Sequence, residues 1–584
     1  MFKKNTAVTG FGIGHFINIL FYLAVVLLLY RILQRIFRGY NIWFPFVITL
    51  LFMAHPVHTE VVASLKNRDE LISMLLSLLT LLLLLKYSDR GRTRHLLLGL
   101  FLYVLAFLSK PTALAFWLVF PLTLYFFTGM KIRRILLITG LITLMIVIGG
   151  MMPFWFLDRV RDVSMVDNPL YFEDNFWNIL GTGMYSLLYY LRLLAVPHPL
   201  LYYYGYDMIP VVNLANPWVV LSILLHLALL GVAILKFREK HVISYAILFY
   251  LLTIAMYSNI VQPVPGIIGE RFLLVPSIAF AMALAWVLFM IFKAVPTSTS
   301  IRASRIFFVT VFTVLILIPY TWKTIDRNRD WASEISLFRA DEKHLDRSVK
   351  AHDLMGTIIM RNVERELAKQ VNVAKFLMPQ IRQSIGHFES AVEIWPGHAS
   401  SWKNLGMIYN NPRIAEHFLA SGDTLEYLHF KKKAVSSFKQ ALVLEPGDGK
   451  ALFNLGFTYE NTGRMDSAMF YYEKCIRHNP GIINPRSRLA DLKFMMGDVQ
   501  EAIRLNREII RIDPMEALPY VSFGNYYMIM GDTLKAIESY EEAAKRNTRP
   551  EVFAFLAEYY SGEGNEEKAR YYRNLYNQAT RPQP

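Results

Sequence analysis

Long apolar runs separated by short polar connections constrain this chain more than any other feature. Ten such runs precede residue 325, and 54% of all residues are hydrophobic. The surface of a soluble protein does not carry runs this dense, whereas a bilayer core requires about 20 apolar residues for each spanning helix. We therefore expect an integral, multi-pass membrane domain over residues 1–324 with about ten spans. The runs cover, approximately, residues 13–30, 40–54, 71–86, 95–109, 112–128, 135–152, 217–235, 242–260, 272–292 and 304–320.

The connections between these runs differ in charge, which predicts the side of the membrane on which each lies. RILQRIFR, KYSDRGRTRH, MKIRR, KFREKH and residues 293–305 are basic and hold few acids, so the positive-inside rule places them in the cytoplasm. Much of the net charge of +15 lies in these clusters, and we expect no nucleic-acid partner. An even number of crossings must then fall between the runs that flank residues 153–216. The apolar stretch 176–196 is therefore expected to be a re-entrant or surface-lying amphipathic helix on the outer side.

After about residue 325 the apolar runs stop and a 34-residue period begins. Pro446, Pro480 and Pro514 are spaced by this period, and glycines and alanines recur with the same period. A helix pair of this length, ended by a proline, is typical of tetratricopeptide repeats. The pattern is clearest at 434–547 and predicts about six units within 325–580, with an insertion of about 16 residues near NNPRIAEHFLASGD. The topology predicts that the array lies on the non-cytoplasmic side.

The stretch HPVHTE, between two apolar runs, holds His55, His58 and Glu60. The proline biases His55 to an extended conformation. The metal-binding pattern HExxH is absent, and with Cys475 as the one cysteine we expect neither a cysteine-based metal site nor an intramolecular disulfide. Two interpretations stay open for the remaining residues. Thr59 caps a helix that starts near Glu60 and the helix dipole favours the carboxylate, or the stretch contributes to a functional site.

Charged residues next to three further runs are the other site candidates. Arg68 and Asp69 begin one run and are either solvated interface charges or site residues. Lys110, in the tight turn of LAFLSKPTALAF, is either a lysine that snorkels to the interface or a fixed cation for a lipid phosphate. Glu270 and Arg271, in GIIGERFLLVPS, are explained by a mutual salt bridge or by interface anchoring, but a guanidinium also binds phosphate bidentately.

The outer segment VPHPLLYYYGYDMIP combines tyrosines with Asp207. Tyrosines at this position are typical of the aromatic belt of a membrane protein. Aromatic rings together with a carboxylate also form sugar-binding surfaces, and Asp207 is therefore a further candidate.

Taken in order, these motifs resemble the transmembrane and tetratricopeptide-repeat (TMTC) O-mannosyltransferase family. The resemblance covers almost the whole chain and implies an all-α protein, with a membrane domain of the C-type glycosyltransferase fold followed by a tetratricopeptide-repeat α-solenoid. It implies transfer of a sugar, typically mannose, from a polyprenyl or dolichyl phosphate to Ser or Thr of a protein outside the cytoplasm, with the repeats recruiting the acceptor. The motifs are HPVHTEVVASLKNRDEL, LAFLSKPTAL, NPLYF, LRLLAVPHPL, YGYDMIP, PVPGIIGERFLLVPS and RNRDWASEISLFRADEKH.

In such an inverting transfer a carboxylate accepts the proton of the acceptor hydroxyl, and cations stabilise the leaving phosphate. The resemblance thus implies that Lys110 and Arg271 bind the donor phosphate. Glu60 and Asp69 are the candidate bases within this chain. No cofactor besides the lipid-linked sugar is implied, and the need for a divalent metal stays open. The substrate pocket would contain His55, His58, Arg68, Asp207 and Glu270.

One departure from the family concerns the beginning of the chain. Relatives begin with a further helix and an outer acidic loop that carries the usual base, and this sequence starts after that point. The predicted topology also requires a preceding helix, because the first run would otherwise place Lys3 and Lys4 on the non-cytoplasmic side of the membrane. We therefore expect a truncated chain or a late start site. The alternative function is a noncatalytic membrane scaffold whose repeats assemble envelope or secretory proteins.

Overall fold

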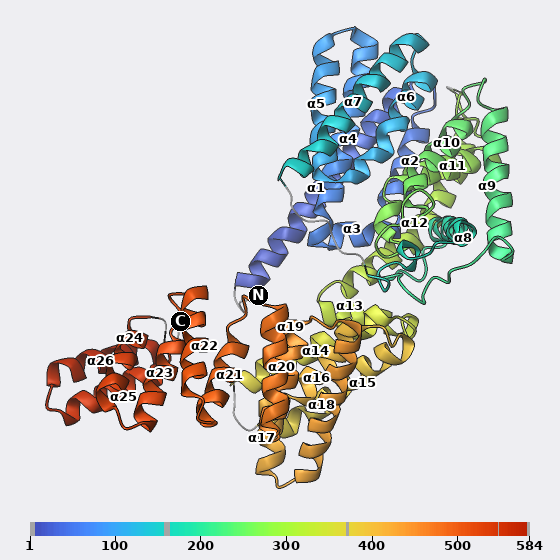
Figure 1. Cartoon of the computed structure of the whole chain (residues 1–584). Helices are drawn as coiled ribbons and strands as arrows, with labels where there is room; N and C mark the ends of the chain where they lie inside the picture. The colour runs from blue at the N-terminus through green and yellow to red at the C-terminus, as the bar shows by residue number, and fades with distance from the viewer. Residues whose placement is uncertain (1–5, 157–163, 299, 370–372, 547, 581–584) are drawn as a thin grey trace. The chain divides into compact units, whose positions relative to one another are not determined.

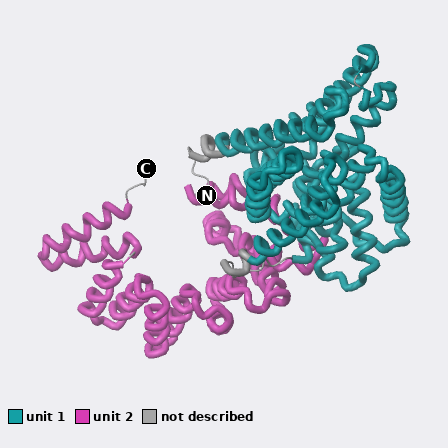
Figure 2. The backbone as a smooth tube through the Cα atoms, turned by 90° about the horizontal axis from the view of Figure 1, so that it is seen from above, with its two compact units in different colours: residues 1–351 teal, residues 352–584 magenta. Residues whose placement is uncertain are grey.

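A computed structural model describes residues 6–156, 164–298, 300–369, 373–546 and 548–580 (Figure 1). Across these residues every regular element is a helix and none is a strand, which confirms the all-α class. The chain divides into two compact units, residues 1–351 and 352–584 (Figure 2), and each is described separately.

The first unit is a bundle of apolar helices. Each of the ten apolar runs lies on one of them, and five helical stretches are long and apolar enough to cross a membrane. The count reaches six if α2 and the following η1–α3, bent by 52° against each other, form one span; four more apolar helices are shorter. Its helices are α1 (Thr6–Ile36), α2 (Trp43–Met53), η1 (Pro56–His58), α3 (Thr59–Ala63), η2 (Leu65–Asn67), α4 (Arg68–Arg90), α5 (Thr93–Ser109), η3 (Pro111–Ala115), α6 (Phe116–Phe127), α7 (Ile132–Phe156), η4 (Pro169–Tyr171), α8 (Phe176–Ala195), α9 (Pro217–Leu235), α10 (Val242–Ile254), η5 (Ala255–Tyr257), η6 (Glu270–Leu273), α11 (Pro276–Ile291), α12 (Ala303–Asp330), α13 (Glu334–Asp341) and η7 (Glu342–His344).

The outward faces of this unit are apolar. On α9, for example, Leu224, Leu227 and Ile234 are each about 60% exposed. Contiguous apolar surface of this kind is rare on soluble monomers and marks contact with a membrane or a partner. Together with the five long apolar helices it identifies a membrane protein, while the count of ten spans stays a prediction.

Helix α8 runs across its neighbours instead of alongside them. In Figure 1 it is seen end-on, whereas α9 is seen from the side. Two glycines allow its close approach to the loops that follow, because a Cβ atom on Gly181 would lie 2.3 Å from the carbonyl oxygen of Val212 and one on Gly183 would lie 2.4 Å from Ile260. It is not among the helices apolar enough to span, and its position at the membrane surface stays a prediction.

The first compact unit continues beyond residue 324, where the sequence placed the domain boundary. Arg327, at the end of α12, forms a bidentate ion pair with Asp341 of α13, with N–O distances of 2.5 and 2.9 Å. The same carboxylate accepts a hydrogen bond of 2.8 Å from the backbone N–H of Tyr202. These buried contacts tie the segment to the membrane unit. Hydropathy marks where apolar helix ends, but it does not report this polar packing.

The second unit is an array of six helix pairs in the part of the chain that the structure describes, which agrees with the α-solenoid expected from the 34-residue period. Pro446, Pro480 and Pro514 each lie two residues beyond the end of the second helix of a pair. The helices are α14 (Val349–Lys369), α15 (Ala374–Ile394), α16 (Ala399–Tyr409), α17 (Pro412–Ala420), α18 (Thr424–Leu444), α19 (Gly449–Asn461), α20 (Met465–His478), α21 (Asn484–Met495), α22 (Val499–Ile512), α23 (Leu518–Ile529), α24 (Thr533–Ala544), α25 (Pro550–Gly562) and α26 (Glu566–Thr580).

A glycine packed under an aromatic ring recurs in four of the pairs. In the first two repeats the ring follows the glycine by 32 residues, and in the other two it follows by 16 residues. The first two repeats therefore each hold 16 additional residues. In the second repeat these residues include α17, where the sequence predicted an insertion. In the first repeat they lengthen α14 and α15, which the sequence analysis missed. The contacts are Gly356–Phe388, Gly406–Phe438, Gly456–Tyr472 and Gly524–Tyr540.

Candidate functional site

The HPVHTE stretch forms a turn of short helices between α2 and α4. His55 is extended, with φ −65° and ψ 123°, as expected before a proline. Helix α3 then begins at Thr59, and no side chain caps it. The hydroxyl of Thr59 donates to the carbonyl oxygen of Pro56 at 2.8 Å. The expected cap by Thr59 is therefore wrong, because the 3-10 turn that starts at Pro56 runs directly into α3 and leaves Thr59 inside the helix.

Both histidines of this stretch are buried and bind other helices. His55 Nε2 lies 2.9 Å from the carbonyl oxygen of Leu194, at the end of α8. His58 Nδ1 lies 2.7 Å from the hydroxyl of Tyr22 on α1, and its Nε2 lies 2.9 Å from the hydroxyl of Ser277 on α11. The structure thus gives both imidazoles a packing role that joins four helices, and their place in a substrate pocket stays a prediction.

Glu60 and Arg271 form a buried ion pair between α3 and η6. Glu60 Oε1 lies 2.8 Å from Arg271 Nη1, and Oε2 accepts a hydrogen bond of 2.9 Å from the backbone N–H of Arg271. The side-chain amide of Asn67 donates to the same carboxylate at 3.3 Å. Glu60 is 5% exposed, while a quarter of the Arg271 side chain is exposed. Glu60 therefore holds Arg271 in place and leaves part of the arginine side chain accessible.

Asp69, Glu70 and Lys110 form a second group at the start of α4. Lys110 Nζ lies 2.7 Å from Asp69 Oδ2 and 3.7 Å from Glu70 Oε1. The hydroxyl of Thr112 donates to Glu70 Oε2 at 2.7 Å. Lys110 and Asp69 are about one-third exposed, whereas Glu70 is 6% exposed. The lysine thus bridges a solvent-accessible carboxylate and a buried one.

A small cavity connects the two groups. Glu70, Thr112, Tyr257 and Arg271 line it together with apolar side chains, and its volume is about 10 Å³, which is enough for about one water molecule. Lys110 lies 3.7 Å from Glu70, and Arg271 lines the cavity together with Glu70, so the two cations predicted to bind phosphate come from separate turns to the surroundings of one carboxylate. The group of three carboxylates and two cations carries a formal charge of −1.

Arg68 faces away from this cavity and binds α1. Its Nε donates to the Asn18 side chain at 2.8 Å, and Nη2 donates to the carbonyl oxygen of Gly14 at 3.0 Å. Asn18 is fully buried and donates in turn to the carbonyl oxygens of Val62 and Ser64, both at 3.1 Å. The two side chains therefore fix the HPVHTE turn against the first helix. The signal for Asn18 was a lone amide within an apolar run, which the sequence analysis passed over.

Glu270 and Arg271 do not bind each other, contrary to the salt bridge considered from the sequence. Glu270 is 1% exposed and accepts hydrogen bonds from the backbone N–H of Leu201 at 2.5 Å and from the hydroxyl of Tyr204 at 3.0 Å. Burial raises the pKa of Glu270 to about 8, although the charge of Arg327 opposes this shift. Glu270 thus anchors the aromatic segment VPHPLLYYYGYDMIP, while its neighbour Arg271 faces Glu60.

Asp207 lies in the same outer segment and pairs with Arg347. Its carboxylate forms two hydrogen bonds with the guanidinium, at 2.9 and 3.1 Å. Arg347 is 70% exposed, and exposed pairs of this kind contribute little to stability. The structure gives Asp207 a surface contact, and its role in a sugar pocket stays a prediction. Among the described residues, no group of three or more His, Cys, Asp or Glu side chains is arranged to hold a metal ion.

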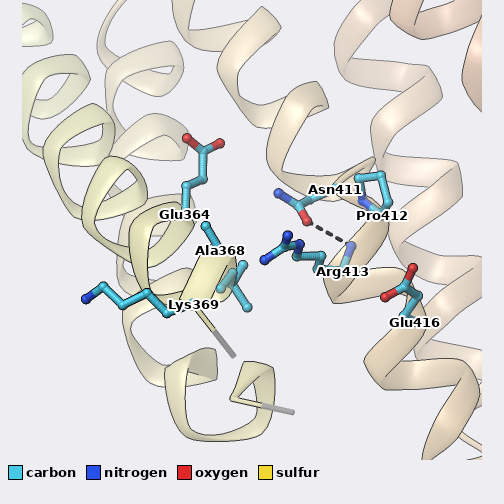
Figure 3. A pocket seen from close by; sticks show the side chains of 8 residues that line it. Glu364, Ala368, Lys369, Asn411, Pro412, Arg413 and Glu416 are labelled. Atoms are coloured by element: carbon cyan, nitrogen blue, oxygen red, sulfur yellow. Dashed lines mark hydrogen bonds between the residues drawn. The ribbon is translucent and has the colours of Figure 1, made fainter. Parts of the chain in front are cut away.

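The repeat unit contains two larger cavities. One, of about 550 Å³, lies between α14 and α17 and is lined by acidic and basic side chains alike, including Glu364, Lys369, Arg413 and Glu416 (Figure 3). The other, of about 780 Å³, is a groove along α21, α23 and α25. Its lining is polar, and the array therefore offers hydrogen-bonding groups to a protein ligand.

The comparisons with known proteins agree with both halves of this architecture. A family model for the tetratricopeptide repeat matches residues 449–481 and 519–549. Protein O-mannosyl-transferase TMTC1 of Mus musculus is 24% identical over 526 residues, which cover 70% of this chain and 52% of that protein. TMTC1 of Homo sapiens is 26% identical over 457 residues, covering 70% and 48%, respectively. TMTC3 of Mus musculus is 23% identical over 583 residues, covering 91% and 54%. The chain spans about half the length of these relatives.

Proposed function

The chain is a TMTC-like protein, as its motifs predicted, and from this premise we propose that it is a membrane glycosyltransferase. In this proposal it moves a sugar, mannose by analogy with the names of its relatives, from a polyprenyl or dolichyl phosphate to a Ser or Thr hydroxyl of a protein. The reaction takes place on the non-cytoplasmic side, where the outer loops and the repeats lie. The acceptor oxygen bonds to the anomeric carbon, the bond from that carbon to the phosphate oxygen breaks, a base takes the hydroxyl proton, and the polyprenyl phosphate leaves.

The nearness of Lys110 and Arg271 to Glu70 is the observation that carries this proposal. The two residues come from turns far apart in the sequence, yet Lys110 lies 3.7 Å from Glu70 and Arg271 lines the same small cavity as Glu70. Two fixed cations suit the negative charge that develops on a leaving phosphate. Because the Lys110–Asp69 pair is partly exposed, an incoming phosphate replaces Asp69 at the lysine, while the buried Glu60–Arg271 pair stays formed and presents the guanidinium.

The repeats supply the protein partner in this proposal. The polar groove along α21, α23 and α25 recruits the acceptor polypeptide, since side chains such as Asn525 and Arg549 are able to bind its backbone or polar groups. The membrane unit binds the lipid donor.

A noncatalytic membrane scaffold is the second candidate. It is favoured by one observation, namely that Lys110 and Arg271 are already paired with carboxylates and that the group as a whole is negative. In this case the charges stabilise the junction of short helices, and the repeats alone carry the function.

Transfer from a labelled donor distinguishes the two candidates. Membranes containing the protein are incubated with labelled polyprenyl-phosphate mannose, and the label is followed into protein. We expect transfer by the wild type and a loss of about 100-fold or more in Lys110→Gln, because removing one group that stabilises developing charge typically has this effect. Lys236→Gln, which removes an exposed ion pair in the connection between α9 and α10, is the control. Absence of transfer by the wild type supports the scaffold, and full activity of Lys110→Gln contradicts the phosphate site.

A further inference from the structure

The carboxylate of Glu70 is held on one side and free on the other. Its Oε2 accepts the hydrogen bond from Thr112, but Oε1 accepts none within the described part of the chain. Lys110 Nζ, at 3.7 Å from Oε1, is too distant for a hydrogen bond. A buried carboxylate oxygen without a donor is costly, and it therefore calls for a partner that this chain does not itself provide.

The space beside this oxygen admits one small polar group. The cavity of about 10 Å³ holds a single water molecule or one hydroxyl group and is too small for a sugar ring. Its walls carry further polar atoms on Thr112, Tyr257 and Arg271, and the ring of Tyr257 stacks on Phe272 with centroids 4.5 Å apart. A carboxylate, a hydroxyl and a guanidinium beside stacked rings suit recognition of a polyol.

We propose that Oε1 of Glu70 accepts a hydrogen bond from one hydroxyl of the transferred sugar, with a water molecule in its place when no donor is bound. The inference rests on the proposed function, in which Lys110 and Arg271 hold the donor phosphate. With the phosphate on these cations, the sugar lies next to the cavity, and one hydroxyl reaches in while the ring stays outside. Glu70 is then a specificity-determining residue that distinguishes sugars by the position of that hydroxyl.

Binding of two lipids by the purified full-length chain in detergent tests this directly. The probes are polyprenyl-phosphate mannose and polyprenyl phosphate without a sugar. In Glu70→Gln we expect affinity for the mannosyl lipid to fall by about 10-fold, because the amide oxygen of glutamine still accepts a hydrogen bond but the bond is no longer to a charged group. Affinity for the lipid phosphate alone should not fall, because the change removes a negative charge beside the two phosphate-binding cations. Glu239→Gln, an exposed glutamate paired with Lys236, is the matched control and should bind both lipids normally.

Deoxy-sugar donors provide a second measurement, and its deciding comparison needs only the wild-type protein. Mannosyl lipids that each lack one hydroxyl are compared, and we expect one of them to lose about 10- to 150-fold in affinity, as for loss of a hydrogen bond to a charged group, while the others bind normally. Glu70→Gln should distinguish that analogue from the parent donor less strongly than the wild type does. If Glu70→Gln does not fold, this series still decides, because equal binding of all analogues by the wild type overturns the proposal.

Three other outcomes overturn this proposal, and a fourth overturns only the proposed transferase function. Equal weakening of both lipids in Glu70→Gln shows that the carboxylate acts on the phosphate-binding cations instead, and unchanged binding of both shows that it contacts neither. A lower kcat with unchanged donor affinity shows a role in proton transfer. Sugar-dependent binding without any transfer by the wild type refutes the proposed transferase function but leaves the contact between Glu70 and the sugar intact.

Discussion

Replacing Arg271 by alanine tests whether the Glu60–Arg271 pair holds the candidate site together. The change removes the cation 2.8 Å from a carboxylate that is only 5% exposed. Breaking a buried ion pair by removing one partner costs about 3 to 5 kcal/mol, because the remaining charge is left uncompensated. Glu60 keeps the hydrogen bonds from the backbone N–H of residue 271 and from Asn67, so we expect the lower end, about 3 kcal/mol. For a large domain, a loss of 1 kcal/mol lowers the midpoint temperature of thermal unfolding by about 2 °C, so this midpoint should fall by about 6 °C.

A double-mutant cycle separates this effect from a loss of packing. Thermal unfolding of the purified full-length protein in detergent is measured for Arg271→Ala, Glu60→Gln and the double variant. A neutral glutamine needs no cation, so adding Glu60→Gln to Arg271→Ala should recover about 2 kcal/mol, within the range of couplings between contacting residues. The reasoning is refuted if Arg271→Ala unfolds at the wild-type midpoint, or if Glu60→Gln fails to restore any stability to it.

Three further changes test other parts of the structure by thermal unfolding of the whole chain. The pKa of Glu270 is raised to about 8, so the folded state binds the extra proton and stability should fall as pH rises from about 4.5 to 8. Glu270→Gln should flatten this pH dependence of stability. A slope equal to that of the wild type would contradict the assignment to Glu270. Burial lowers the pKa of Lys431 to about 8, so the unfolded state binds the extra proton and stability should rise between about pH 8 and 10.5, a rise that Lys431→Met should remove. In Gly456→Val the new Cβ atom would lie 2.7 Å from the Tyr472 ring, and we expect the free energy of unfolding to fall by about 1 to 3 kcal/mol. The control Gly386→Val has open space around the new Cβ atom and should not show this loss from a clash.

Much of the fold follows from the sequence because its signals are periodic and local. Apolar runs predicted the helices of the first unit, and prolines spaced by 34 residues predicted where the second helices of the repeats end. The short helices around Thr59 were not predicted, since a single proline decides between a loop and a 3-10 turn that continues as α-helix. The additional residues of the first repeat were also missed, because α14 and α15 are lengthened without any turn residue to mark the change.

The sequence pointed to several charged residues of the candidate site, but not to the residues with which they pair. Lys110, Arg271, Glu60 and Asp69 all stood out as charges at the ends of apolar runs. Their pairing depends on contacts between residues 41 positions apart for Lys110 with Asp69, and 211 apart for Arg271 with Glu60, which no local pattern reveals. Glu70 was not among the site candidates predicted from the sequence, although the structure buries it 3.7 Å from Lys110 and beside the cavity that Arg271 lines. Its importance arises only from the three-dimensional arrangement.

The 16 additional residues of the first two repeats make the array uneven in height. Helices α14, α15 and α18 each have 21 residues, whereas α19 and α20 have 13 and 14. At 1.5 Å per residue, the longer helices extend about 11 to 12 Å further. The solenoid therefore has a step between its second and third pairs, with a tall end and a low end. For a polypeptide lying along the shorter pairs, as proposed for the acceptor, this step would block movement toward the first repeat and would so limit the register in which an elongated ligand binds.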